Sequence, residues 1–132
     1  MNLSILRVAL LPMVMVVSAA SAADFSIGFD WGNLKKCVSG NPNTVPSPRF
    51  TVRAVPAGTA AIRFRMTDLA VPGYPHGGGK VAYKGGSTIA PGAFTYRSPC
   101  PPDGRHTYQW TATALDAAGR KLGEAEARKP YP

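Results

Sequence analysis

The sequence predicts an all-β protein, an antiparallel β-sandwich, and three observations lead to this prediction. First, apolar and polar residues alternate along several short runs, which is typical of half-buried strands. Second, turn-forming segments rich in Gly and Pro separate these runs. Third, no stretch after residue 22 combines helical length, capping residues and a 3.6-residue period. About six or seven short strands at this spacing favour a sandwich.

Each predicted strand has one apolar face. Ile62, Phe64 and Met66 share one side of a strand, whereas Arg63 and Arg65 share the other. Similar alternation covers residues 25–31, 50–54, 80–84, 106–114 and, less clearly, 121–129. The last of these runs fits either an edge strand or a short C-terminal helix.

The length and the charge describe one basic domain. The chain has 132 residues, with 15 Lys and Arg against 7 Asp and Glu, so its formal net charge is +8. Arg49, Arg53, Arg63 and Arg65 all fall on the solvent side of predicted strands. They form either an ordinary solvated face or a basic surface for anionic lipid headgroups or another acidic partner. We expect no nucleic-acid partner, because no aromatic-basic stacking motif is present.

The N-terminal segment predicts export. Arg7 is the only charged residue before Asp24, an apolar run of ten residues follows it, and Ala20-Ser21-Ala22 fits a small-residue cleavage site. The apolar run is too short to span a bilayer, so a retained anchor is the alternative that we favour less. We therefore expect a cleaved signal peptide at 1–22, a single domain at 23–132, and a periplasmic or secreted protein.

An exported chain places its two cysteines, Cys37 and Cys100, in an oxidising compartment. Two cysteines allow only one intramolecular pairing. Closing the long loop between them would stabilise the fold by roughly 4 kcal/mol in the chain-entropy model. The sequence thus predicts a Cys37–Cys100 disulfide, with two buried thiols as the alternative.

Several polar residues continue the apolar faces of strands. Asp68 has the parity of Met66, and His106 and Tyr108 have the parity of Trp110, so all three are expected to point inward. A carboxylate there needs donors or the mouth of a cavity. His76 lies in a glycine-rich loop, in which the backbone N–H groups of Gly77 and Gly78 are candidates for anion binding. These residues are candidates for one polar pocket, but parity alone favours the alternative that each is satisfied separately within its own turn.

Catalytic and metal motifs are mostly absent. His76-Gly77-Gly78-Gly79 matches an oxyanion-hole motif of esterases, but that chemistry needs a Ser nucleophile in Gly-x-Ser-x-Gly, which this sequence lacks. The two His and Asp68 have no zinc-ligand spacing. We expect no enzyme, no metal and no cofactor; a histidine-dependent hydrolase and a zinc site remain the alternatives.

The most specific motif is SPCPPDGRHTY at residues 98–108, followed by Ala114-Leu115-Asp116. It resembles the Gly-Pro-Cys-Pro-Pro-x-Gly, His-Arg-Tyr and Ala-Leu-Asp motifs of the phosphatidylethanolamine-binding protein family. The likeness is closest to the bacterial Raf-kinase-inhibitor-like branch, in a shortened form. Upstream, residues 55–59 resemble the Val-Pro-x-Gly-Thr turn of this family, and residues 68–72 resemble its Asp-Pro-Asp-Ala-Pro motif with Ala70 in place of the second acid.

The resemblance implies a β-sandwich with a small pocket for phosphate or phosphorylethanolamine-like headgroups. In this sequence the corresponding pocket residues are Asp68, His76, His106 and Tyr108. We therefore expect an exported binding protein for a small anionic or phospholipid headgroup, with peripheral contact to an anionic membrane surface. The alternative is a periplasmic protein-interaction or inhibitor module that uses the Gly-rich and Pro-rich loops.

Overall fold

The structure is a computed structural model that describes residues 14–16 and 23–132. Most of the expected signal peptide, 1–22, lies outside the described residues, so the signal peptide stays a prediction. In the part of the chain that the structure describes, every regular element is a strand. No helix there is long and apolar enough to cross a membrane.

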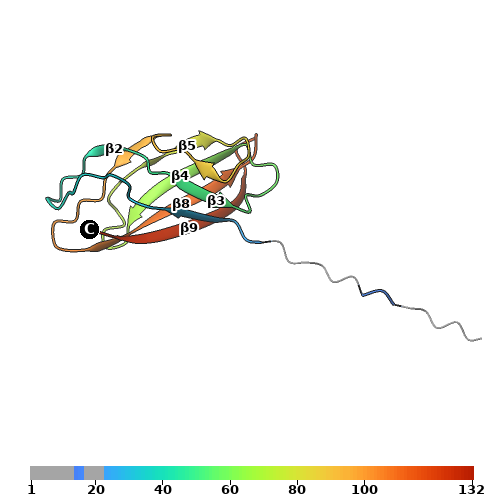
Figure 1. Cartoon of the computed structure of the whole chain (residues 1–132), viewed down its shortest axis with the longest axis horizontal. Helices are drawn as coiled ribbons and strands as arrows, with labels where there is room; N and C mark the ends of the chain where they lie inside the picture. Colours follow the sequence, from blue (N-terminus) through green and yellow to red (C-terminus); the bar gives the residue numbers. More distant parts are fainter. Residues whose placement is uncertain (1–13, 17–22) are drawn as a thin grey trace, which may run out of the picture.

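Nine strands form the described domain (Figure 1). They are β1 (Ser26–Phe29), β2 (Thr44–Pro46), β3 (Phe50–Arg53), β4 (Ala61–Asp68), β5 (Gly78–Ala82), β6 (Thr88–Ile89), β7 (Thr95–Arg97), β8 (His106–Leu115) and β9 (Lys121–Tyr131). The number exceeds the six or seven expected because β2, β6 and β7 have only two or three residues. Strands this short are too brief to show a two-residue period.

All strand pairs are antiparallel, and the strands form three sheets. The largest sheet has the order β5-β4-β8-β9, the second has the order β1-β3-β6, and β2 pairs with β7. The C-terminal segment is thus an edge strand of the largest sheet, and its helical alternative is excluded. The predicted all-β antiparallel sandwich is confirmed, because the inward side chains of the two larger sheets share one core.

Aromatic side chains dominate that core. Phe50 of β3 stacks on Phe64 of β4 with ring centroids 4.2 Å apart, and it meets the edge of Trp110 of β8 at 5.2 Å. Tyr96 of β7 closes the other side of Trp110 at 4.9 Å. Such offset and edge-to-face pairs add to the free energy that burial of apolar area supplies. They hold the sheets in one register relative to each other.

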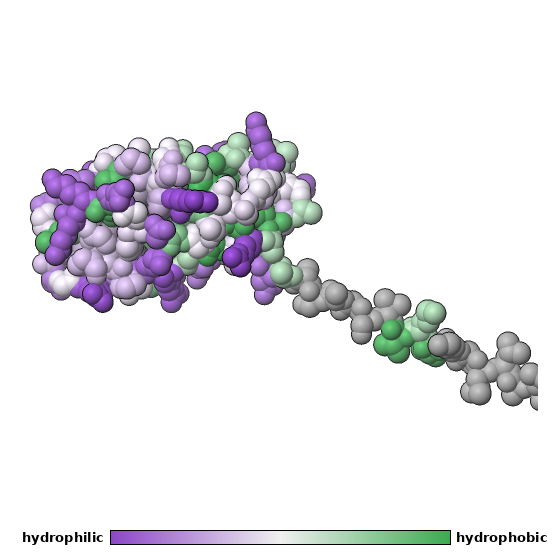
Figure 2. Space-filling model, in the orientation of Figure 1, coloured by the Kyte–Doolittle hydropathy of each residue, from purple (hydrophilic) through white to green (hydrophobic). Residues whose placement is uncertain are grey.

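The predicted faces of the strands are confirmed. Along β4, Ile62, Phe64 and Met66 are buried, whereas Arg63 and Arg65 are exposed. Hydrophilic side chains lie along the visible face of the sandwich without forming one continuous patch (Figure 2). Asp68 ends the buried face of β4 and is itself only 5% exposed.

The predicted disulfide joins Cys37 to Cys100. It ties the segment before β2 to the Pro-rich loop after β7, and both cysteines are buried. The backbone N–H of Cys37 also donates to the hydroxyl of Tyr131, at 2.9 Å. These contacts fasten two loops, which lack regular hydrogen bonding of their own, to the last strand of the largest sheet.

We predict that a Cys37→Ser/Cys100→Ser double variant loses about 2–5 kcal/mol of unfolding free energy, because the open chain gains conformational entropy when unfolded. Urea unfolding followed by circular dichroism measures the loss. Treatment of the wild type with a thiol reductant under the same conditions should produce a similar loss, and a double variant as stable as the wild type would contradict the prediction.

Candidate functional site

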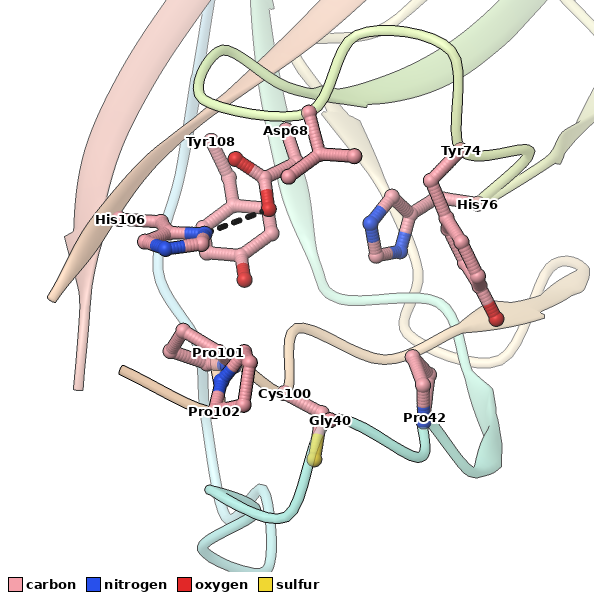
Figure 3. Close-up of a pocket in the computed structure, with 11 residues that line it drawn as sticks. Gly40, Pro42, Asp68, Tyr74, His76, Cys100, Pro101, Pro102, His106 and Tyr108 are labelled. Carbon is pink, nitrogen blue, oxygen red and sulfur yellow. Dashed lines mark hydrogen bonds and ion pairs between the residues drawn. The ribbon is translucent and has the colours of Figure 1, made fainter. Parts of the chain in front are cut away.

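A small pocket lies at one end of the sandwich, where β4 ends and β8 begins (Figure 3). The antiparallel register pairs Asp68 with Tyr108, so the two strand ends bring their polar residues together. The cavity has a volume of about 180 Å³. It is lined by Gly40, Pro42, Asp68, Val71, Tyr74, His76, Cys100, Pro101, Pro102, His106 and Tyr108. The four side chains predicted from parity and loop chemistry therefore converge on one cavity.

Asp68 is the buried acid of this pocket. One carboxylate oxygen accepts a hydrogen bond from the backbone N–H of Ala70 at 2.9 Å, which makes a local turn. The other oxygen accepts a hydrogen bond from Nδ1 of His106 at 2.7 Å (Figure 3). A carboxylate accepts up to four hydrogen bonds, so both oxygens keep capacity for a further donor.

His106 is held between two carboxylates. Its Nδ1 donates to Asp68, and its Nε2 donates to Asp103 at 2.7 Å. Because a carboxylate only accepts hydrogen bonds, both ring nitrogens carry a proton and the ring is an imidazolium. The hydrogen bond to Asp68 is the main cause that raises the pKa of His106 above its usual range, and Asp103 adds to it.

His76 has the opposite character. Its ring is buried, and Nδ1 donates to the backbone carbonyl of Arg97 at 2.8 Å. Burial lowers the pKa of His76, so the ring is neutral at pH 7. Since Nδ1 carries the proton, Nε2 holds a lone pair. This nitrogen faces the cavity in Figure 3, and no hydrogen bond from the described residues reaches it.

Two tyrosines complete the interior. The hydroxyl of Tyr108 points into the cavity (Figure 3), and burial together with the charge of Asp68 raises the pKa of Tyr108. The ring of Tyr108 meets the ring of His76 edge-on, at 5.5 Å between centroids. Tyr74 packs on the other side of His76 at 4.6 Å. The Tyr108 hydroxyl is therefore a neutral group at the cavity surface, within reach of Asp68 and the backbone of Cys100.

Two loops joined by the disulfide form the wall opposite these residues. Gly40 and Pro42 come from the first loop, and Cys100 to Pro102 come from the second. Gly40 has φ +78°, and a Cβ there would lie 3.2 Å from Pro102, so the close contact of the loops requires glycine. Ser98, which stands where the resembled motif has Gly, accepts a hydrogen bond from the N–H of Asn43 at 3.0 Å. The serine thus adds a further link between the loops.

Gly77 and Gly78 do not line this pocket. The carbonyl of Gly77 accepts a hydrogen bond from the N–H of Met66, and Gly78 begins β5 opposite Arg65. A Cβ at Gly78 would collide with the carbonyl oxygen of Phe64. This geometry does not support the expectation that these glycines direct their N–H groups at a ligand in the pocket. Glycine is needed at position 78 because β4 and β5 lie too close together there for a side chain.

Sequence reasoning missed Asp103, Tyr74 and the wall at Gly40 and Pro42. Asp103 lies three residues before His106, but this spacing alone does not predict that the turn places the carboxylate of Asp103 against Nε2 of His106. The carbonyl of Arg97, which sets the tautomer of His76, leaves no trace in a sequence because every residue has a carbonyl. The wall depends on the disulfide and on the paths of two loops.

The role assigned to Gly78 predicts that Gly78→Ala destabilises the fold by about 1–3 kcal/mol or more, because the new methyl meets backbone that cannot move away. The matched control is Gly73→Ala, since nothing lies within 4 Å of a Cβ there and it should change stability little. Thermal unfolding of both variants tests this, and equal stability of the two would refute the structural role of Gly78.

The protonated state of His106 predicts a pH-dependent stability. The pKa of His106 is higher in the folded protein than in the unfolded chain. Its stabilising contribution to the unfolding free energy is therefore complete below the unfolded pKa of about 6.5, and it is lost as the pH rises through the folded pKa. The unfolding free energy of the wild type should therefore fall as the pH rises above about 6.5. His106→Gln should flatten this slope, and urea titrations across the range measure it. An unchanged slope in the variant would assign the effect to other groups.

The comparisons with known proteins were made on sequence and on structure. No family model and no curated protein matches the chain by sequence. Among solved structures, a putative phosphatidylethanolamine-binding protein homologue of Chlamydia trachomatis, CT736, matches with a TM-score of 0.58 and 18% identity, over 83% of this chain and 97% of that chain. YbcL of E. coli, described as a new member of the mammalian family of these proteins, matches with a TM-score of 0.57 and 18% identity, over 83% and 98%.

A likeness at 18% identity shows the fold alone. The chain therefore has the fold of these phosphatidylethanolamine-binding protein homologues, as the motifs at residues 98–116 led us to expect.

Proposed function

We propose that this chain is an exported binding protein for a small phosphoryl-bearing headgroup of the phosphorylethanolamine type. One observation carries the proposal: Asp68, His76, His106 and Tyr108, which come from distant parts of the chain, line one cavity at the end of an apolar core. Burial of a carboxylate and an imidazolium at one place costs solvation energy, and such sites are often functional.

The size of the cavity supports a small ligand. Pockets for drug-sized molecules usually measure about 300–1,000 Å³, whereas this one measures about 180 Å³. A headgroup of a few heavy atoms fits such a volume, and a whole lipid does not. If the ligand is an intact lipid, its acyl chains must therefore remain outside the pocket.

The Asp68–His106 pair supplies the specific charge. Asp68 accepts hydrogen bonds from an ammonium or hydroxyl part of the headgroup, and the hydroxyl of Tyr108 lies beside it in the cavity (Figure 3). Both nitrogens of His106 already donate to carboxylates, so His106 acts by positioning the carboxylate of Asp68. Asp103 is largely exposed, and a ligand that displaced it would free Nε2 for a phosphoryl oxygen.

The mouth of the pocket and the overall charge support contact with a membrane surface. Val71, which lines the pocket, and its neighbour Leu69 are 48% and 39% exposed. Apolar side chains beside a headgroup site suit the boundary between headgroups and acyl chains, and the net charge of +8 favours an anionic lipid surface. The predicted signal peptide and the disulfide support a periplasmic or secreted location.

We predict that the wild type binds phosphorylethanolamine and that His106→Ala weakens binding at least about tenfold, because Asp68 loses its buried counter-ion. Isothermal titration calorimetry measures both affinities. Arg63→Ala, which removes an exposed charge on the outer face of β4, is the control and should bind like the wild type. Circular dichroism confirms that each variant is folded. Absence of heat with the folded wild type would reject the proposed function.

A further inference from the structure

The outer face of the largest sheet carries charges of opposite sign on its two sides. β4, β8 and β9 lie side by side in this sheet, and β5 lies next to β4 (Figure 1). In the central part of the sheet, the outward side chains are cationic on β4 and β5, uncharged on β8 and acidic on β9. They are Arg63, Arg65 and Lys80, then Thr111 and Thr113, and finally Glu124 and Glu126.

The register of the strands arranges these side chains in rows that cross the sheet. Arg63 on β4 is paired with Thr113 on β8, and Thr113 is paired with Glu124 on β9. Neighbouring strands lie about 4.8 Å apart, so the cation and the carboxylate of this row lie on opposite sides of β8, at equal distances from it. A second row has the same order of side chains: Arg65, Thr111 and Glu126.

The cations of this face are not neutralised within the described part of the chain. Arg63 and Lys80 are direct cross-strand partners, and like charges in this position destabilise a sheet. The ion pairs that the described residues form include neither of these side chains, nor Arg65. An acidic group from another molecule would therefore relieve a repulsion that the described fold leaves in place.

The carboxylates of β9 are available for such a contact. Glu124 pairs with Lys121 at 3.0 Å, and Glu126 pairs with Arg128 at 3.8 Å, but all four side chains are at least 39% exposed. Exposed ion pairs contribute only about 0–1 kcal/mol to stability. A carboxylate also accepts several hydrogen bonds at once. Both glutamates can therefore contact a second cation at little cost.

We infer that the outer face of the largest sheet binds a second copy of this chain, with a two-fold axis that runs parallel to β8. Rotation by 180° about this axis places β4 of one copy over β9 of the other, and β8 over β8. Arg63 then faces Glu124 of the second copy, and the same contact forms in the reverse direction because the axis is two-fold. The second row repeats the match, with Arg65 facing Glu126 of the second copy.

The dimensions of the side chains fit this arrangement. Sheets that pack face to face lie about 10 Å apart, a distance that an extended arginine and a glutamate span together. The threonines of β8 are short, so they leave room at the axis for water, which is common in polar interfaces. The next row along the strands causes no conflict, since Arg128 faces the uncharged Thr67 of the second copy.

The charge pattern also selects the direction of the axis. A two-fold axis across the strands would place β4 over β4 and β9 over β9, so like charges would face each other, which is costly. Two copies with a net charge of +8 also repel each other at long range. At a salt concentration of about 0.15 M this repulsion is screened beyond about 8 Å, whereas charges in contact are screened less.

This symmetry gives the dimer a property that one copy lacks. Rotation about an axis parallel to the strands leaves the strand directions unchanged, so the two pockets, each at the end of β4, open at the same end of the dimer. Both can then engage one surface at the same time. On a surface with many ligands, binding by the second pocket becomes effectively intramolecular, and the apparent affinity rises.

Sedimentation equilibrium of the exported chain tests the inference. In about 0.15 M NaCl, and over protein concentrations from about 1 μM to about 1 mM, the wild type should shift from monomer to dimer. A wild type that stays monomeric over this range would overturn the inference.

Two charge-reversal variants connect the dimer to the named face. Arg63→Glu/Arg65→Glu makes both sides of the face acidic, and Glu124→Arg/Glu126→Arg makes both sides cationic. Each variant alone should dimerise at least about tenfold more weakly than the wild type, because like charges then face each other. An equimolar mixture of the two variants should form a heterodimer, because each acidic side then meets a cationic one.

The matched control is Arg49→Glu/Arg53→Glu, which makes the same change of charge at exposed positions before and at the end of β3. It should dimerise at least as strongly as the wild type. Circular dichroism checks that every variant is folded. A mixture of the two folded face variants that stays monomeric, or a control that loses the dimer equally, would overturn the inference.

A different occupant of the face would also overturn it. If the wild type stays monomeric but binds poly-glutamate, and the Arg63→Glu/Arg65→Glu variant does not, the partner is an acidic chain and not a second copy. None of these outcomes bears on the ligand of the pocket, which the calorimetry of the proposed function tests separately.

Discussion

The antiparallel pairing of β4 with β8 is the constraint on which the rest of this structure depends. Its register places Phe64 beside Ala112 and Met66 beside Trp110 in the core, and the same register places Asp68 beside Tyr108 at the pocket. A slip by one residue would turn every side chain of a strand to the opposite face. The apolar core therefore specifies the geometry of the polar site, because both lie on the same two strand faces.

At the pocket end of the β4–β8 strand pair, the buried charges are stable because each lies against an opposite charge. Asp68 is buried, and an isolated carboxylate there would either take up a proton or destabilise the fold. His106, two residues before Tyr108 on β8, supplies the opposite charge, and the exposed Asp103 completes the trio from outside. His76 stays neutral because burial lowers its pKa more than the carbonyl of Arg97 and the charge of Asp68 raise it. Two histidines of one pocket thus have opposite protonation states.

The remaining wall depends on a covalent link between loops. A domain of this size has a limited apolar core, and the segments around residues 37–42 and 99–102 contribute few large apolar side chains to it. The disulfide and the paired hydrogen bonds between Ser98 and Asn43 hold these segments against the sheets. A small rigid cavity results from loops that would otherwise be free to separate.

The sequence by itself determined the strand faces, and with them the burial of Asp68, the inward direction of Tyr108 and the exposure of the strand arginines. These properties follow from a two-residue period, which is local and visible in any run of alternating residues. The sequence also determined which two cysteines could pair, since only one intramolecular disulfide was possible. Only the tertiary structure decided that both nitrogens of His106 meet carboxylates, that His76 turns an acceptor to the cavity, and that Gly77 and Gly78 serve the strands instead. These features depend on register, loop paths and backbone carbonyls from distant segments, and no local pattern of residues encodes such contacts.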